Sequence, residues 1–191
     1  MDAKRIDVKI FANSDANVDL RTLMPVFQRW IQEDKLPGLL IDVADYTHVP
    51  DGPAMVLVAH EAQYVYDLAK GRPGLLYSAR RDGKAKGPED FDGRLRQACS
   101  AALQACALLE QDTALRFAGG DVMVRINDRL AAPNEPATFD KVRPAIERLV
   151  TQLYNGSPVS IEPRPASAEA FTVDIRATNA PSVKDLAAKL S

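Results

Sequence analysis

The sequence is poor in the residues from which many recognisable sites are built. Among 191 residues it has two cysteines, two histidines and one tryptophan. Two cysteines are too few for disulfides to stabilise a chain of this length, and they form no CxxC pair. We therefore expect a reducing, cytoplasmic location. No stretch approaches the roughly 20 apolar residues that a membrane-spanning helix needs, and the first residues do not resemble a signal peptide. We therefore expect neither a membrane span nor a secretion signal.

The sequence also lacks an excess of charge of one sign. It has 24 Lys and Arg against 26 Asp and Glu, which gives a net charge of −2. A general nucleic-acid binder needs a surplus of basic side chains, so we expect no nucleic-acid partner. The chain contains no GxGxxG, GxxxxGK or GxSxG motif, so it predicts no cofactor. A composition of 46% hydrophobic and 26% charged residues is typical of a globular domain.

Hydrophobic periodicity predicts a mixture of strands and helices. We expect strands at 6–11, 39–43, 55–59, 122–126, 159–161 and 171–176, and helices at 20–35, 88–111, 139–154 and 183–190. Residues 62–78 fit a hairpin turning at 70–73, but their first part also fits one helical turn, and the sequence leaves both open. If Thr22 caps the first helix, Pro25 falls in its first turn, where a missing N–H costs nothing. A start at Asp19 would instead predict a kink.

Two parts of the chain resemble each other. Residues 8–10 correspond to 124–126, and residues 25–31 correspond to 144–150. The pattern strand, helix, strand, strand, helix occurs twice, which predicts an internal duplication. We therefore expect an α/β (α+β) fold of two tandem ferredoxin-like units, a resemblance of topology only. The first unit spans 1–115 and contains the extra hairpin and the long helix, and the second spans 116–191.

Strand alternation predicts one sheet face that the helices leave uncovered. If Ile6, Val8 and Ile10 point at the helices, the residues between them point away. The same parity places charged side chains from three strands on that face. This face is a solvated surface with cross-strand ion pairs, a protein interface, or a cleft for a small anionic ligand. The sequence leaves all three interpretations open. The predicted ligand or interface residues are Asp7, Lys9, Arg125, Asp174 and Arg176.

The candidates for chemistry are few. If strands 39–43 and 55–60 pair antiparallel, Asp42 is expected across from His60, a pairing that suits a general base or a structural hydrogen bond equally well. His48 is expected too far away to complete a metal site, so we predict none. Cys99 and Cys106 lie in an apolar helical stripe and are expected to be core residues. The basic run 80–87 suits either an acidic partner or a solvated loop.

These observations favour a binding or assembly module over an enzyme. We expect a subunit or accessory factor of a larger cytoplasmic complex, or a homo-oligomer, with a protein partner or a second copy of itself. The alternative is a small-molecule-binding regulator or enzyme with a polar cleft. That cleft would use His60, Asp42 and the basic residues of the uncovered sheet face.

Overall fold

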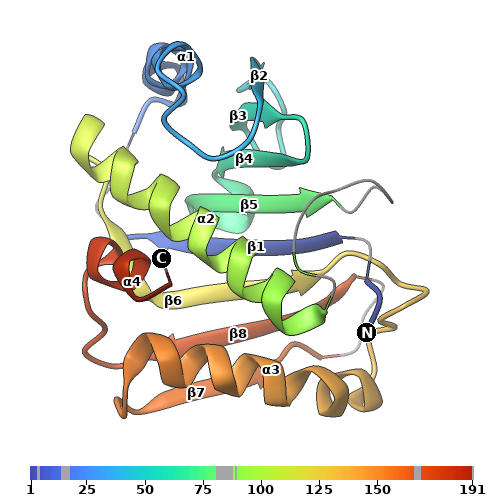
Figure 1. The fold of residues 1–191 in the computed structure, drawn as a ribbon. Helices are drawn as coiled ribbons and strands as arrows, with labels where there is room; N and C mark the ends of the chain where they lie inside the picture. Colours follow the sequence, from blue (N-terminus) through green and yellow to red (C-terminus); the bar gives the residue numbers. More distant parts are fainter. Residues whose placement is uncertain (4, 14–17, 81–87, 89, 166–168, 191) are drawn as a thin grey trace.

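A computed structural model describes residues 1–3, 5–13, 18–80, 88, 90–165 and 169–190. Within these ranges the chain forms one eight-stranded antiparallel sheet and four α-helices, in an α/β arrangement (Figure 1). The strand order across the sheet is β2-β3-β4-β5-β1-β6-β8-β7. The strands are β1 (Arg5–Ala12), β2 (Leu40–Tyr46), β3 (Ala54–Ala59), β4 (Ala62–Asp67), β5 (Gly74–Arg80), β6 (Phe117–Ile126), β7 (Val159–Pro163) and β8 (Phe171–Ala177). The helices are α1 (Leu23–Gln32), α2 (Phe91–Asp112), α3 (Pro136–Tyr154) and α4 (Val183–Leu190), with short 3-10 turns at Leu20–Thr22 and Ala69–Gly71.

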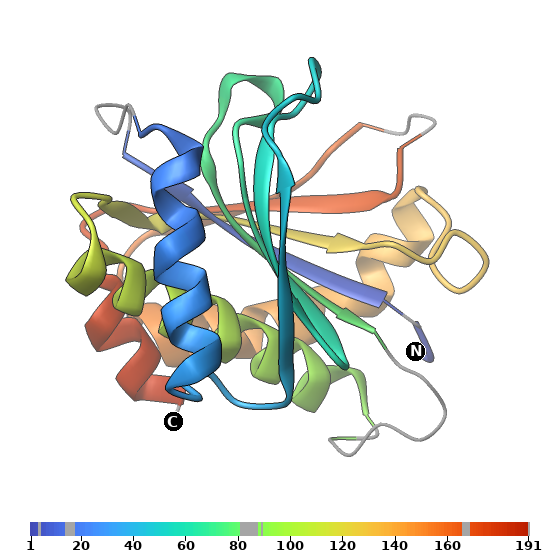
Figure 2. The same cartoon turned by 90° about the horizontal axis from the view of Figure 1, so that it is seen from above.

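The helices lie on one side of the sheet, and the strands rotate strongly from one edge of the sheet to the other (Figure 2). Alternate strand residues such as Ile6, Val8 and Ile10 point toward the helices and join a single hydrophobic core with them. The residues between them lie on the opposite side, which we call the open face. None of the described helices is both long enough and apolar enough to cross a membrane.

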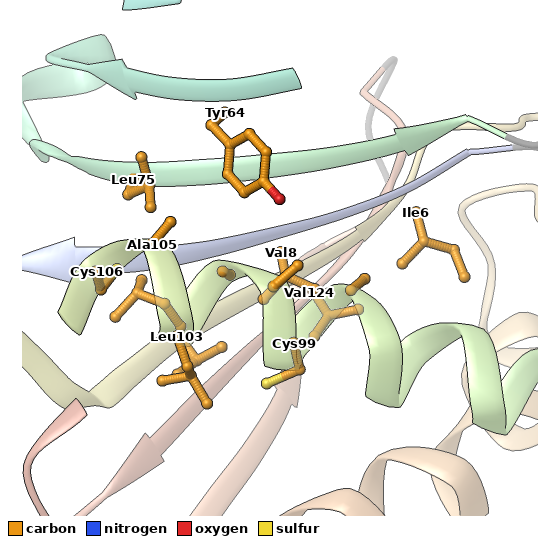
Figure 3. Close-up of a cluster of buried hydrophobic side chains, with 14 of the residues drawn as sticks. Ile6, Val8, Tyr64, Leu75, Cys99, Leu103, Ala105, Cys106 and Val124 are labelled. Carbon is orange, nitrogen blue, oxygen red and sulfur yellow. The ribbon is translucent and has the colours of Figure 1, made fainter. Parts of the chain in front are cut away.

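Helix α2 lies at the centre of the core because its small side chains allow close packing. Cys99 and Cys106 are both buried and unbridged, as predicted. Cys99 lies near Val8 and Val124, and Cys106 lies beside Ala105 and toward Leu75 (Figure 3). Burial in this apolar layer raises the pKa of the Cys99 thiol to about 12. Their position in the core stripe of α2 is therefore a packing role.

The structure resolves two alternatives that the sequence left open. Helix α1 begins after Thr22, so Pro25 lies in its first turn and no kink is needed. Residues 62–78 form the hairpin β4–β5, because β4 pairs with β3 on one side and with β5 on the other. The alternation of β4 buries Tyr64 and Tyr66 and leaves Gln63 and Val65 partly exposed.

Several predicted boundaries were wrong, and those of β6 and α3 concern the glycine pair and a proline. Strand β6 begins at Phe117 rather than Val122 and includes Gly119 and Gly120. A Cβ at Gly120 would lie 2.4 Å from the Ala177 carbonyl oxygen, so the pair of glycines marks a close backbone approach and not a strand boundary. Helix α3 begins at Pro136, three residues before the predicted start, which places Pro144 inside the helix rather than near its first turn.

Candidate functional site

Register brings the charged residues of the open face into rows. One row across the sheet consists of Ser78, Asp7, Arg125 and Thr172, from β5, β1, β6 and β8. The next row consists of Leu76, Lys9, Met123 and Asp174, from the same four strands. Polar and apolar side chains therefore meet at the middle of the sheet, on the face without helices.

A hollow of about 340 Å³ lies over these rows. Its charged lining residues are Lys9, Asp67, Lys70, Arg72, Arg125, Arg164, Glu169 and Asp174. Its other lining residues are Phe11, Ala69, Leu76, Met123 and Thr172. The strands supply the floor, while the β4–β5 connection and the segments flanking β7 and β8 supply the rim. We refer to this cavity as the hollow.

Asp7 holds Arg125 in place beneath the hollow. The Asp7 side chain is fully buried and its Oδ2 accepts from Nε of Arg125 at 2.8 Å, with Nη2 also 2.8 Å away. Its other oxygen accepts from the Ser78 hydroxyl at 2.6 Å, and that hydroxyl accepts from Arg5. Because both oxygens of the carboxylate are hydrogen-bonded, the guanidinium of Arg125 is held in one orientation.

Lys9 is the buried cation of the site. Its ammonium donates to Asp67 Oδ1 and to the Arg72 carbonyl oxygen, each at 2.8 Å. Burial lowers the pKa of Lys9, and the nearby carboxylate of Asp67 opposes that shift. The Asp67 oxygen also accepts from the Ala69 N–H at 2.8 Å, which fixes the start of the β4–β5 connection.

Three further ion pairs surround the hollow. Arg164 forms a bidentate pair with Asp174, with both distances 2.9 Å. The Arg72 guanidinium stacks 3.6 Å from the centre of the Phe11 ring and donates to Asp121 at 2.6 Å. Lys70 and Glu169, both exposed, pair at 2.5 Å and link the β4–β5 connection to the segment before β8.

The structure brings together four of the five residues predicted for the open face. Lys9, Arg125 and Asp174 line the hollow, and Asp7 lies directly behind Arg125. Arg176 does not line it: it is exposed further along β8, opposite Asp121, where it borders a separate recess with Gly119 and Gly120.

Sequence reasoning missed the arginines Arg72 and Arg164. Strand alternation assigns faces only within strands, and both residues lie in connections beyond the strand ends. The sequence does carry a weak signal, since each arginine lies next to a proline, Pro73 or Pro163, at a strand boundary. Nothing local, however, indicates that these two connections reach the same cavity.

The predicted opposition of Asp42 and His60 is wrong. Strand β2 continues to Tyr46, which pairs with Ala54, and this register places Asp42 opposite Val58. A register shift at Ile41 then aligns His60 with Leu39, whose carbonyl oxygen accepts from the His60 backbone N–H at 2.9 Å. The side chains of Asp42 and His60 are both exposed, and Asp42 Oδ1 accepts from the Val43 N–H. In the described part of the chain, no hydrogen bond or ion pair joins Asp42 to His60. His60 instead borders a wide groove of about 980 Å³ beside α2.

The described residues contain no group of three or more His, Cys, Asp or Glu side chains placed to hold a metal ion. The basic run 80–87 lies outside the described residues, apart from the backbone of Arg80. No protein-family model and no curated protein matches this chain.

Proposed function

We propose that this protein is a cytoplasmic binding module whose binding surface is the open face of the sheet. The hollow receives the anionic group of a ligand, and Arg125 and Arg164 hold that group. The protein works by binding and presenting this ligand, on its own or within a larger assembly, rather than by transforming it.

The unequal exposure of the ion-pair partners carries this proposal. The Arg125 side chain is 35% exposed, whereas its partner Asp7 is 0% exposed. The Arg164 side chain is 28% exposed and its partner Asp174 is 16% exposed. In both pairs the arginine is the more exposed partner and lines the hollow. Five basic side chains line the hollow against three carboxylates, Asp67, Glu169 and Asp174, so basic groups predominate.

The donors that remain on these arginines suit an anion. A guanidinium has five N–H groups in a fixed plane. Arg125 and Arg164 each direct Nε and Nη2 at their carboxylate, which leaves Nη1 outside the ion pair. Since Asp7 and Asp174 already hold the two side chains, a ligand loses little rotamer entropy in ordering them.

A thermal-shift panel of phosphate, citrate, benzoate and phenyl phosphate tests this function. A ligand present at 100 times its dissociation constant stabilises the fold by about 2.7 kcal/mol. We expect at least one of these anions to stabilise the wild-type protein, and Arg164→Gln to lose most of that response. Arg143→Gln is the matched control, because Arg143 forms an exposed pair with Glu147 on α3.

Two results would contradict the proposal. The first is the absence of any stabilisation by the four anions. The second is an equal loss of response in Arg164→Gln and Arg143→Gln, which would mean that the anions act on the overall charge of the protein rather than at the hollow.

Strand β2 favours a second role, self-association. It is an edge strand, and on or beside it Leu39, Ile41 and Tyr46 are 66%, 52% and 48% exposed. An exposed apolar edge strand is a surface on which a second copy can pack. Light scattering after size-exclusion chromatography tests this role. We expect the wild-type protein to be a dimer and Ile41→Lys to be a monomer. A wild-type protein that stays monomeric at tens of micromolar would exclude self-association through β2.

We also infer that the two halves, 1–115 and 116–191, arose by duplication of a ferredoxin-like unit. The arrangement of strands supports this, because β1 and β6 are antiparallel neighbours with Val8 opposite Val124. From that pair outward, the order β6-β8-β7 matches β1-β3-β2 once the hairpin β4–β5 is set aside. The hairpin would then be an insertion that supplies Asp67 and Arg72 to the hollow.

A further inference from the structure

The floor of the hollow contains an apolar strip between its cations. Leu76 and Met123 flank Lys9 on the neighbouring strands, in direct register. Phe11 lies two residues further along β1 and also lines the hollow. Three strands therefore contribute one large apolar side chain each to the lining of the hollow. Phe11 and Met123 are each 5% exposed, so each presents only a small part of its surface to the cavity.

The cationic groups lie on two sides of this strip. The Arg72 guanidinium covers the Phe11 ring at one side. Arg125 lies on the other side of the strip, on β6 two residues from Met123 and directly opposite Thr172 of β8. Arg164 also lies there, because it pairs with Asp174, which is opposite Met123 on β8. A ligand that reaches Arg125 and Arg164 therefore also covers apolar side chains, which a bare inorganic anion cannot exploit.

The size of the hollow limits the ligand. A volume of about 340 Å³ is at the lower end of small-molecule sites, which range from roughly 300 to 1,000 Å³. That space suits a molecule with a single ring or a short branched chain, together with one charged group.

We infer that the ligand is a small organic acid, a carboxylate or phosphate monoester attached to an apolar body about the size of one aromatic ring. Its acidic group binds Arg125 and Arg164, and its body lies on Leu76 and Met123, beside the Phe11 ring that Arg72 covers. This inference rests on the proposed function and specifies the ligand class of the same site.

Isothermal titration calorimetry with four probes tests the inference. The probes are inorganic phosphate, phenyl phosphate, benzoate and neutral benzyl alcohol. Because burying a ring-sized apolar body adds to the affinity, we expect phenyl phosphate to bind at least about tenfold more tightly than inorganic phosphate. Comparing benzoate with phenyl phosphate identifies which acidic group the arginines prefer, and benzyl alcohol should not bind measurably.

A variant of a floor residue distinguishes the contribution of the apolar body to the affinity from that of the acidic group. Met123→Gln keeps the length of the side chain but makes it polar, so we expect it to weaken phenyl phosphate about tenfold and inorganic phosphate by less than about twofold. Leu130→Gln is the matched control, because Leu130 is 99% exposed and does not line the hollow. If Met123→Gln does not fold, Leu76→Gln makes the same comparison.

The outcomes distinguish this inference from the proposed function. Equal affinities for inorganic phosphate and phenyl phosphate would overturn the apolar body and leave an anion-binding hollow. Binding of benzyl alcohol as tight as that of phenyl phosphate would instead remove the role of the arginines, and with it the proposed function.

Discussion

The pairing of Lys9 with Asp67 shows why burial and charge must be considered together. The ammonium is almost fully buried and depends on one carboxylate and one carbonyl oxygen. Removing one partner of a buried pair leaves the other charge uncompensated, which costs about 3–5 kcal/mol. An exposed pair contributes only about 0–1 kcal/mol, because water solvates both of its partners.

Replacing Asp67 by asparagine should therefore destabilise the protein by about 3 kcal/mol. The amide keeps an oxygen for the Ala69 N–H, so the change mainly removes the negative charge beside Lys9. Glu147→Gln is the control, since it makes the same change opposite the exposed Arg143 and should cost less than about 1 kcal/mol. Urea unfolding gives both values, and similar losses in the two variants would mean that Lys9 does not depend on Asp67.

Tyrosines in or beside the core make the fold sensitive to alkaline pH. Burial raises the pKa of Tyr66 and of Tyr77 to about 12, from an ordinary value of 10. Burial also raises the pKa of Tyr64 and of Tyr154. A phenol whose pKa is higher in the folded state stabilises the fold fully below pH 10 and loses that contribution as the pH rises toward 12.

Phenolate absorbance and circular dichroism, recorded together, test this pH dependence. We expect the buried phenols to ionise only as the protein unfolds, between about pH 10 and pH 12. Tyr46→Phe provides the baseline, because it removes the exposed phenol and leaves three buried tyrosines and the partly buried Tyr77. Full ionisation of that variant with its circular dichroism unchanged would contradict the prediction.

Among the elements, α1 depends on a specific attachment to α2. The fully buried Trp30 donates through Nε1 to Asp112 Oδ2 at 2.7 Å, and Arg29 pairs with the same carboxylate at 2.9 Å. Partial burial would raise the pKa of Asp112, but these hydrogen bonds lower it overall. The end of α2 thus holds α1 over β2 and β3, at the edge of the sheet farthest from β7.

Asp112→Ala should destabilise the protein by about 1–3 kcal/mol, because the buried indole N–H loses its acceptor. Asp112→Asn retains an acceptor oxygen and should cost clearly less. Trp30 is the single tryptophan, so its fluorescence during urea unfolding reports directly on this attachment. Equal losses in the two variants would show that the hydrogen bond from Trp30 is unimportant.

For the whole molecule, the continuous sheet predicts cooperative unfolding. Strands β1 and β6 join the two halves at the middle of the sheet, and α2 packs on β1 and β5 as well as on α3 and α4. Neither half can separate without exposing the core on both sides of this junction. We expect transitions followed by Trp30 fluorescence and by far-ultraviolet circular dichroism to coincide. Two separated transitions would show that 1–115 and 116–191 unfold independently.

The sequence determined the local features of this protein. Alternation in residues 6–11 and 171–176 assigned Asp7, Lys9 and Asp174 to the open face, because successive strand residues point to opposite sides whatever lies around them. Helical periodicity placed Cys99 and Cys106 in the core for a similar reason. The face on which a side chain lies depends only on the period of its strand or helix, which residues adjacent in the sequence determine.

Only the tertiary structure decided which side chains meet. Arg72 and Arg164 reach the hollow because the sheet order brings two distant connections to the same face, and no local pattern encodes that order. The separation of Asp42 from His60 depends on where the β2–β3 loop closes and on the shift at Ile41. Strand register is fixed by packing across the whole sheet, so the sequence indicated the site residues that lie on strands but not which side chains they would meet.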